Sequence, residues 1–175
     1  RRNLSQTELD ELRGQFSTDD RPALIYSVPN DPTIGQPTMR DVKKGLNAQV
    51  LFGENRLDAL VGDYLIAAMH VDNVLGYIAK DQLLVTPGDR TDVLLAAIAS
   101  RLSSSTPDIA GVLLTGGLRP SERVCKFIEG WTGSPLPILM TQDHTYKAVL
   151  ALQGIIAPIE PGDLRKINTV LGLFE

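Results

Sequence analysis

The sequence predicts an α/β fold in which helices cover both faces of a mainly parallel β-sheet, a three-layer α/β/α arrangement. Segments typical of strands and helices alternate along most of the chain, as they do in βαβ units. The strand segments are continuous apolar runs, such as QLLVT at 82–86 and IAGVLL at 109–114. Strands buried on both faces have this composition. The chain has 175 residues, of which 43% are hydrophobic, enough for one domain with a real core and a short appendage.

The N-terminal part of the chain predicts one helix, one strand and a boundary. Ser5 is followed three residues later by Glu8, a capping box that starts a helix over residues 4–16. The apolar run ALIYSV at 23–28 predicts a buried strand. Residues 29–37 hold several prolines. This change in composition marks a loop and a candidate domain boundary.

The elements after this loop follow one another in a regular order. Thr38 with Asp41 forms a second capping pattern, which predicts a helix over 38–47. The remaining elements are expected as a strand at 49–52, a polar connection at 53–62, a strand at 64–68, a helix at 71–79, a strand at 82–86, a helix at 91–104, a strand at 109–114, a helix at 120–130, a strand at 137–140, a helix at 144–153, a short apolar segment at 155–157 and a helix at 161–173.

Charge and composition narrow the classes of partner. The net charge of −4, the absence of a run of Lys or Arg, and an aromatic content of 5% argue against a nucleic-acid binder. No apolar run approaches the roughly 20 residues of a membrane helix. The single cysteine, Cys125, cannot form an internal disulfide, so we expect a cytoplasmic protein with Cys125 as a small core residue of a helix. The chain does not begin with methionine, and we expect a longer parent protein.

Three successive strand ends carry small, polar or charged residues. Ligands of parallel α/β sheets gather at the carboxyl ends of the strands. The strand at 82–86 is followed by PGDRTD, the strand at 109–114 by TGGLR, and the strand at 137–140 by TQDHT. The candidate ligand-binding residues are Gly88, Asp89, Arg90, Thr115, Gly116, Gly117, Asp143 and Thr145.

These residue types suit a ligand that carries phosphate or carboxylate. Gly116 and Gly117 permit close backbone approach, and their N–H groups are candidates to bind an anion beside a helix N-terminus. Arg90 and Arg119 would add positive charge. Asp89 would hold Arg90 in place or accept a hydrogen bond from a ribose hydroxyl.

Each feature also has a purely structural interpretation. Glycines after a strand often serve only a tight turn, and Asp143 or Thr145 is more typical of a helix cap than of a ligand contact. Asp89 and Arg90 equally suit a local ion pair, which contributes little when exposed.

Several catalytic signatures are absent from the sequence. His70 and His144 have no metal-ligand spacing to another His, Cys or Asp. The chain contains no G-x-S-x-G, no Gly-Lys pair that a P-loop requires, and no G-x-G-x-x-G. We therefore expect no catalytic residue, no metal and no cofactor in this chain.

The same strand ends carry a family resemblance. Residues 87–93 (PGDRTDV), 114–117 (LTGG) with Pro120, and 143–146 (DHTY) with Ala148 resemble successive motifs of the DRTGG domain. Residues 61–69 are similar to its beginning, and the last helix, from Pro161-Gly162-Asp163 onward with Lys166 and Ile167, is similar to its end. Each motif is weak alone, whereas the ordered set, covering residues 38–175, is specific. The literal string DRTGG does not occur, because Asp92 follows Asp89-Arg90-Thr91.

The segment before it carries a second resemblance. Residues 25–37 (IYSVPNDPTIGQP) are similar to the exit from a dethiobiotin-synthetase-like P-loop domain, which precedes DRTGG in long bacterial phosphotransacetylases. We therefore expect residues 1–37 to be the tail or linker of a preceding P-loop-like domain, and residues 38–175 to be the DRTGG domain.

The resemblance implies a regulatory role and a fold similar to the N-terminal domain of HPr kinase. DRTGG domains tend to dimerise and occur near adenine-nucleotide effectors. We expect a non-catalytic regulatory and dimerisation module of a phosphotransacetylase-related protein, which senses a phosphorylated or adenine-nucleotide metabolite. The alternatives are an acyl- or phosphoryl-transfer enzyme similar to phosphate acetyltransferase, with His144 as base, and a pure oligomerisation scaffold.

Overall fold

The computed structural model describes residues 4–17, 25, 31–133, 135–159, 161 and 163–173. The chain divides into two compact units. One unit is Gln36–Ala157, and the other combines Arg1–Gly35 with Pro158–Glu175. All five strands of the sheet belong to the first unit, which we call the sheet unit.

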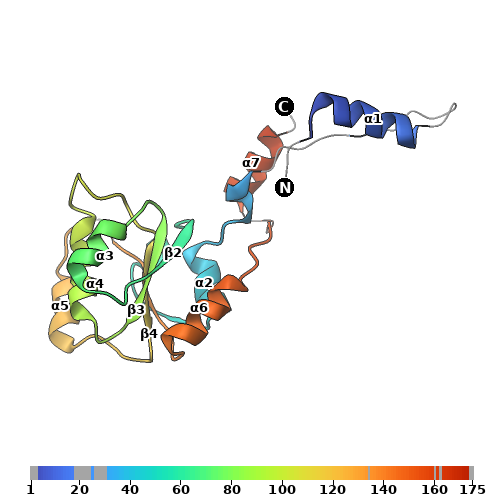
Figure 1. Ribbon diagram of the computed structural model, residues 1–175. Helices are drawn as coiled ribbons and strands as arrows, with labels where there is room; N and C mark the ends of the chain where they lie inside the picture. Colours follow the sequence, from blue (N-terminus) through green and yellow to red (C-terminus); the bar gives the residue numbers. More distant parts are fainter. Residues whose placement is uncertain are drawn as a thin grey trace. The chain divides into compact units, whose positions relative to one another are not determined.

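The sheet is mainly parallel, as the sequence predicts (Figure 1). Its strand order is β1-β5-β4-β3-β2. The four strands β2 to β5 run parallel, and β1 pairs antiparallel with β5 at one edge. The bounds are Gln49–Phe52 for β1, Asp63–Ile66 for β2, Gln82–Pro87 for β3, Gly111–Thr115 for β4 and Ile138–Met140 for β5.

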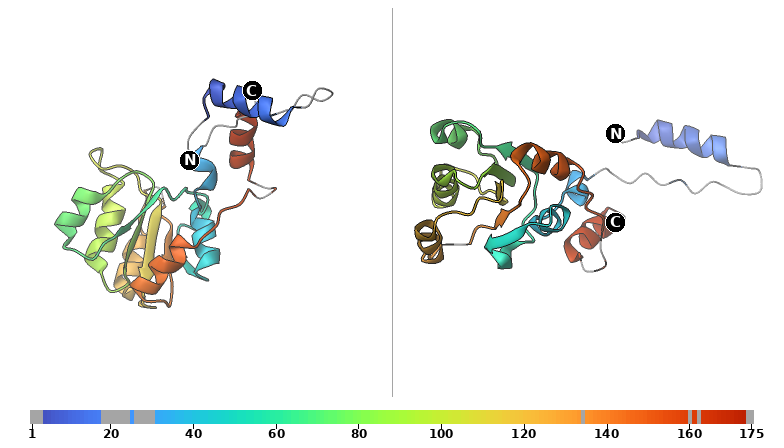
Figure 2. Two further views of the ribbon diagram at one scale, coloured as in Figure 1. Left: turned by 45° about the vertical axis from the view of Figure 1, so that its right-hand side comes forward. Right: turned by 90° about the horizontal axis from the view of Figure 1, so that it is seen from below.

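The order of the parallel strands determines where the helices lie. From β2 to β5 each strand is added beside the previous one in the same direction. Since such crossovers are right-handed, the helices between these strands all fall on one face. These are α3 (Val71–Tyr77), α4 (Thr91–Ser100) and α5 (Glu122–Glu129). The other face is covered by α2 (Met39–Gly45) and α6 (Thr145–Gln153), as Figures 1 and 2 show.

Side chains that alternate along each strand build two separate cores. On β4, Leu113 packs in the cluster that includes α2 and α6, whereas Val112 and Leu114 pack with α3, α4 and α5. The same alternation separates Leu83 from Leu84 on β3. All of these side chains are fully buried. The sheet is therefore apolar on both faces, which explains its continuous apolar sequence and confirms the three-layer prediction.

The predicted helix at 91–104 is too long, because α4 ends at Ser100. The N–H groups of Leu102 and Ser103 donate to carbonyls three residues back, at 3.0 and 3.1 Å. Such bonds tighten the final turn of a helix. The hydroxyl of Thr106 then donates to the carbonyl of Ser100. The Ser100 carbonyl thus accepts hydrogen bonds from both Ser103 and Thr106, beyond the end of the helix.

The other element boundaries differ by a few residues from the predictions. The strand predicted at 64–68 is Asp63–Ile66, and the strand predicted at 109–114 is Gly111–Thr115. The helix predicted at 71–79 ends at Tyr77. The polar connection at 53–62 contains a short 3-10 helix, Glu54–Arg56. The predicted capping box of α2 is confirmed, since the Asp41 N–H donates to Thr38 Oγ1 at 3.3 Å and the Thr38 N–H to Asp41 Oδ2 at 2.8 Å.

The second unit contains α1 (Gln6–Phe16), a 3-10 helix at Pro32–Gly35 and α7 (Leu164–Gly172). The capping box of α1 is confirmed, because the Ser5 N–H donates to Glu8 Oε2 at 2.7 Å. The strand predicted at 23–28 falls, apart from Ile25, outside the described residues. No helix in the part of the chain that the structure describes is long and apolar enough to cross a membrane.

Candidate functional site

Hydrogen bonds connect the end of β4 and the loop after it to the loop after β3, the loop after β5 and the first residue of α6. The Gly88 N–H donates to the Thr115 carbonyl at 3.1 Å, and the Gly116 N–H donates to the Asp143 carbonyl at 2.8 Å. The hydroxyls of Thr115 and Thr145 lie 2.7 Å apart and share a hydrogen bond. The structure thus brings the three predicted segments together at the carboxyl edge of the sheet.

The two glycines after β4 are required by the turn itself. Gly116 has φ +81° and Gly117 has φ +66°, backbone conformations that favour glycine. Their N–H groups are already used, since Gly116 donates to the Asp143 carbonyl and Gly117 to the Thr141 carbonyl at 2.9 Å. In this structure neither amide points to an anion site, and their part in ligand binding stays a prediction. They join adjacent loops of the protein instead.

The close approach of a neighbouring loop leaves room only for glycine at position 88. A Cβ at this position would lie 1.7 Å from the carbonyl oxygen of Leu118. No side chain fits there unless the loop after β4 moves. Gly88 is therefore a packing residue that holds the loop after β3 against the loop after β4.

Arg90 pairs with Asp92 and not with Asp89, contrary to one of our expectations. Its Nε and Nη2 donate to the two carboxylate oxygens of Asp92 at 2.9 and 2.8 Å. Nη2 also donates to the carbonyl of Met69 at 3.0 Å, which joins the loop after β2 to the same edge. Asp89 is exposed. For Nη1 of Arg90, no acceptor occurs among the residues that the structure describes.

The pair changes the titration of both groups. Hydrogen bonds from Arg90 lower the pKa of Asp92 to about 2, and the same bonds raise the pKa of Arg90. A carboxyl whose folded pKa lies below its unfolded value of about 4 stabilises the fold above that value. This stabilisation is lost as the pH falls toward 2.

We expect Asp92→Asn to remove this acid-sensitive contribution. Because Asp92 is 46% exposed, solvent screening should limit the contribution to about 0.5 kcal/mol. Urea unfolding of both proteins between pH 5 and pH 2 would measure it. In an independent check, NMR titration of the Arg90→Ala variant should show that the Asp92 pKa has risen to about 4. An unchanged pKa in that variant would contradict the assignment.

Asp143 and Thr145 do not cap the following helix, contrary to the structural interpretation of the sequence. The N-cap of α6 is His144, and it makes no side-chain capping bond. Asp143 instead accepts a hydrogen bond from Lys147 Nζ at 2.6 Å, and Thr145 bonds Thr115 across the loops. His144 is exposed, and no hydroxyl or thiol of the described residues bonds its ring. The geometry therefore gives no support to His144 as a base.

Residues of the loop after β4 and of α5 line a shallow hollow on the surface. The helix is capped by Ser121, whose hydroxyl accepts from the Val124 N–H. Cys125 is buried in this helix, as predicted. The hollow, of about 330 Å³, mixes both signs of charge and is lined by Arg119, Pro120, Glu122, Cys125, Lys126 and Glu129.

Sequence analysis missed Asp92 and the Met69 carbonyl as partners of Arg90. An acid two residues after an arginine at a helix start is a usable signal for the first. A backbone carbonyl leaves no such signal. Among the described residues, no group of three or more His, Cys, Asp or Glu side chains lies where it could hold a metal ion.

Known phosphate acetyltransferases resemble this chain over part of their length. The enzyme of Nitratidesulfovibrio vulgaris is 55% identical over 154 residues, which cover 88% of this chain and 22% of that protein. The enzyme of a Synechocystis species is 36% identical over 177 residues, which cover 99% of this chain and 25% of that protein. The chain thus spans about a quarter or less of the curated relatives it matches.

A solved structure shares the fold. It contains the CBS and DRTGG domains of the regulatory region of Clostridium perfringens pyrophosphatase, in complex with the activator diadenosine tetraphosphate. The TM-score is 0.52 at 16% identity, over 82% of this chain and 64% of that one. The family described as the DRTGG domain matches residues 41–155, which include the β3, β4 and β5 loops. The chain therefore belongs to the DRTGG domain family.

Proposed function

We propose that this chain is a non-catalytic regulatory module of a phosphate acetyltransferase-related protein. It would sense a phosphorylated or adenine-nucleotide metabolite at the carboxyl edge of the sheet. Two findings support the proposal. The matched relatives are phosphate acetyltransferases that are at least four times longer than the matched segment. The structural neighbour comes from a regulatory region that binds a dinucleotide activator.

The observation that carries the proposed site is the way Arg90 is held. Asp92 and the Met69 carbonyl fix the guanidinium through Nε and Nη2. Its side chain is 28% exposed, and Nη1 would donate to a phosphate or carboxylate of the ligand. A cation that is already oriented loses little entropy when it binds an anion.

The hydrogen bonds between the loops would transmit the effect of ligand binding from this site to the rest of the sheet unit. A ligand at Arg90 touches the loops after β2 and β3, and Gly88 and Thr115 connect these to the loop after β4. A ligand can shift the balance between two arrangements only by its difference in affinity for them. We propose that the two arrangements differ in the packing of these loops.

The proposal extends to the parent protein. Residues 1–37 would be the tail or linker of a preceding P-loop-like domain, residues 38–175 would form the DRTGG domain, and two copies would pair in the cytoplasm. Acetyl transfer would belong to a different part of the parent protein. Sedimentation of the purified chain would test the dimer separately from ligand binding.

A thermal-shift screen tests the sensing function. The purified chain is heated with AMP, ADP, ATP, diadenosine tetraphosphate, NADH, acetyl phosphate, coenzyme A or pyruvate. A ligand at about 100 times its dissociation constant stabilises the fold by about 2.7 kcal/mol, so one class should raise the melting temperature clearly. Arg90→Ala should weaken that ligand roughly tenfold or more, because a charge-assisted hydrogen bond contributes about 1.5 to 3 kcal/mol.

Arg40→Ala is the matched control for this screen. Arg40 is also a surface arginine paired with an aspartate, at 2.9 Å from Asp58, but it lies in α2 and not at the candidate site. Ligand affinity should be unchanged in this variant. Equal ligand affinity in the wild type and in Arg90→Ala would show that Arg90 is not part of the site. If none of the ligands raised the melting temperature, the alternative of an oligomerisation scaffold would be favoured.

A further inference from the structure

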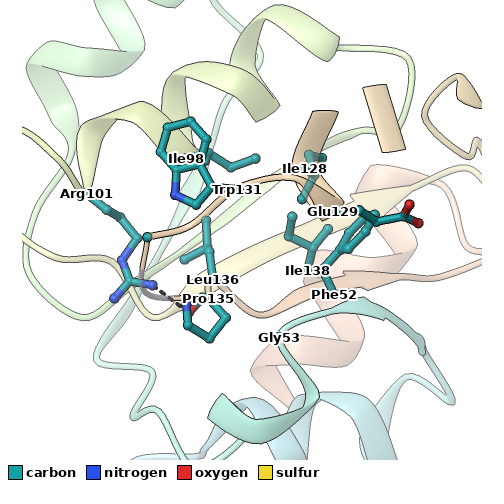
Figure 3. A pocket seen from close by; sticks show the side chains of 11 residues that line it. Phe52, Gly53, Ile98, Arg101, Ile128, Glu129, Trp131, Pro135, Leu136 and Ile138 are labelled. Carbon is teal, nitrogen blue, oxygen red and sulfur yellow. Dashed lines mark hydrogen bonds between the residues drawn. The ribbon is translucent and has the colours of Figure 1, made fainter. Parts of the chain in front are cut away.

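A cavity of about 220 Å³ lies at the amino-terminal edge of the parallel strands, away from the Arg90 site. It is bounded by the residues that precede β5, the first residue of β5, the end of β1, and the last turns of α4 and α5. Figure 3 shows the side chains that surround it. All of them belong to the sheet unit. None of the residues predicted from the sequence as a ligand contact lines this cavity.

The walls are apolar and one of them is an indole. Ile98, Ile128, Leu136 and Ile138 surround the space together with Trp131. The Trp131 ring packs against Phe127, with centroids 5.9 Å apart in an edge-to-face arrangement. Edge-to-face packing is a favourable arrangement of two aromatic rings.

Gly133 allows the indole to take this position. A Cβ on Gly133 would lie 2.4 Å from Trp131 Nε1. The ring therefore packs directly against the backbone of this loop. Apolar cavities of roughly 150 Å³ can bind benzene, so this somewhat larger space suits one aromatic ring with a short substituent.

The two charged residues of the cavity stand at opposite ends of it (Figure 3). Arg101 is only 10% exposed and is neutralised by Asp108, with Nε 2.7 Å from Oδ1 and Nη2 3.1 Å from Oδ2. Its Nη1 donates to the Pro135 carbonyl at 2.7 Å. Glu129 at the other end is exposed and has no ion-pair partner among the described residues. The lining of the cavity is therefore more apolar than polar, and a carboxylate without an ion-pair partner among the described residues stands at one end.

We propose that this cavity is a second binding site, for a small aromatic amine. The ring lies between Trp131 and the isoleucine side chains, and the ammonium group lies toward the end of the cavity that carries Glu129. A carboxylate on the same ring meets repulsion at that end and no free cation at the other. The site lies on a different edge of the sheet from Arg90 and does not rest on the proposed sensing function.

Trp131 is the only tryptophan of the chain, so its fluorescence reports directly on the cavity. The purified chain is titrated with benzylamine, benzyl alcohol and benzoate, which share one ring and differ in charge. We expect a saturable change in emission with benzylamine, and at least a fivefold weaker affinity for benzoate. Benzyl alcohol should fall between them.

Substitutions at Glu129 and Ile128 test the role of the carboxylate and the role of the cavity space separately. Glu129→Gln should make the benzylamine and benzyl alcohol affinities equal within a factor of two. Glu122→Gln is the matched control, because Glu122 is exposed on the same helix, pairs with Lys126 and does not line this cavity. It should preserve the preference. Ile128→Phe, which fills the space with a larger side chain, should weaken all three probes at least fivefold.

The proposal is overturned by any of three results. The first is the absence of a saturable change in Trp131 emission with all three probes. The second is an affinity for benzoate that equals or exceeds that for benzylamine. The third is a preference for benzylamine that survives Glu129→Gln. Since Glu129 is exposed, this variant should fold, and its circular dichroism spectrum would verify that it does.

Discussion

Replacing Gly88 with alanine is expected to destabilise the sheet unit by about 3 kcal/mol or more. The new methyl group would lie 1.7 Å from the Leu118 carbonyl oxygen, which belongs to the backbone and cannot rotate away. The loops after β3 and β4 would have to separate, and the bond from the Gly88 N–H to the Thr115 carbonyl would break. Urea unfolding followed by circular dichroism would measure the loss.

Gly76→Ala is the matched control for this change. Gly76 lies within α3, and a Cβ there meets no atom within 4 Å. Alanine in a helix is favoured over glycine by up to about 1 kcal/mol, so this variant should be as stable as the wild type or more so. If Gly88→Ala cost less than about 1 kcal/mol, the contact between the two loops would be much looser than the structure describes.

The layers of this fold could be predicted because each rests on local sequence. The apolar runs of β3, β4 and β5 indicate strands buried on both faces. The capping boxes at Ser5 and Thr38 mark two helix starts within one or two residues. The end of α4 was predicted four residues too late, and the Thr106 hydroxyl that bonds the Ser100 carbonyl beyond this end reaches back over six residues. No local pattern signals that contact.

The candidate site was predictable in position but not in its bonds. Parallel strands place their carboxyl ends on one edge, so the loops after β3, β4 and β5 had to meet there. Which groups bond depends on strand register, and register placed carbonyl oxygens of Thr141 and Asp143 in front of the two glycine amides. The cavity beside Trp131 depends in the same way on where α4 and α5 end. Neither could be inferred from residue types.

Leu113→Ala and Leu114→Ala should each lower the free energy of unfolding by about 3 to 5 kcal/mol. This is the loss expected when a buried leucine is shortened and the surrounding side chains fill the space only in part. Leu113 packs in the cluster that includes α2 and α6, and Leu114 packs in the cluster that includes α3, α4 and α5. Both are 0% exposed. If helices covered only one face of the sheet, one of these two adjacent substitutions would be nearly neutral. Urea unfolding of the two variants therefore tests the three-layer arrangement.

Leu102→Ala is the control. Leu102 is 66% exposed, and its replacement should change the free energy of unfolding by less than about 0.5 kcal/mol. A large loss at Leu102, or a loss at only one of the two strand positions, would contradict the assignment of two cores.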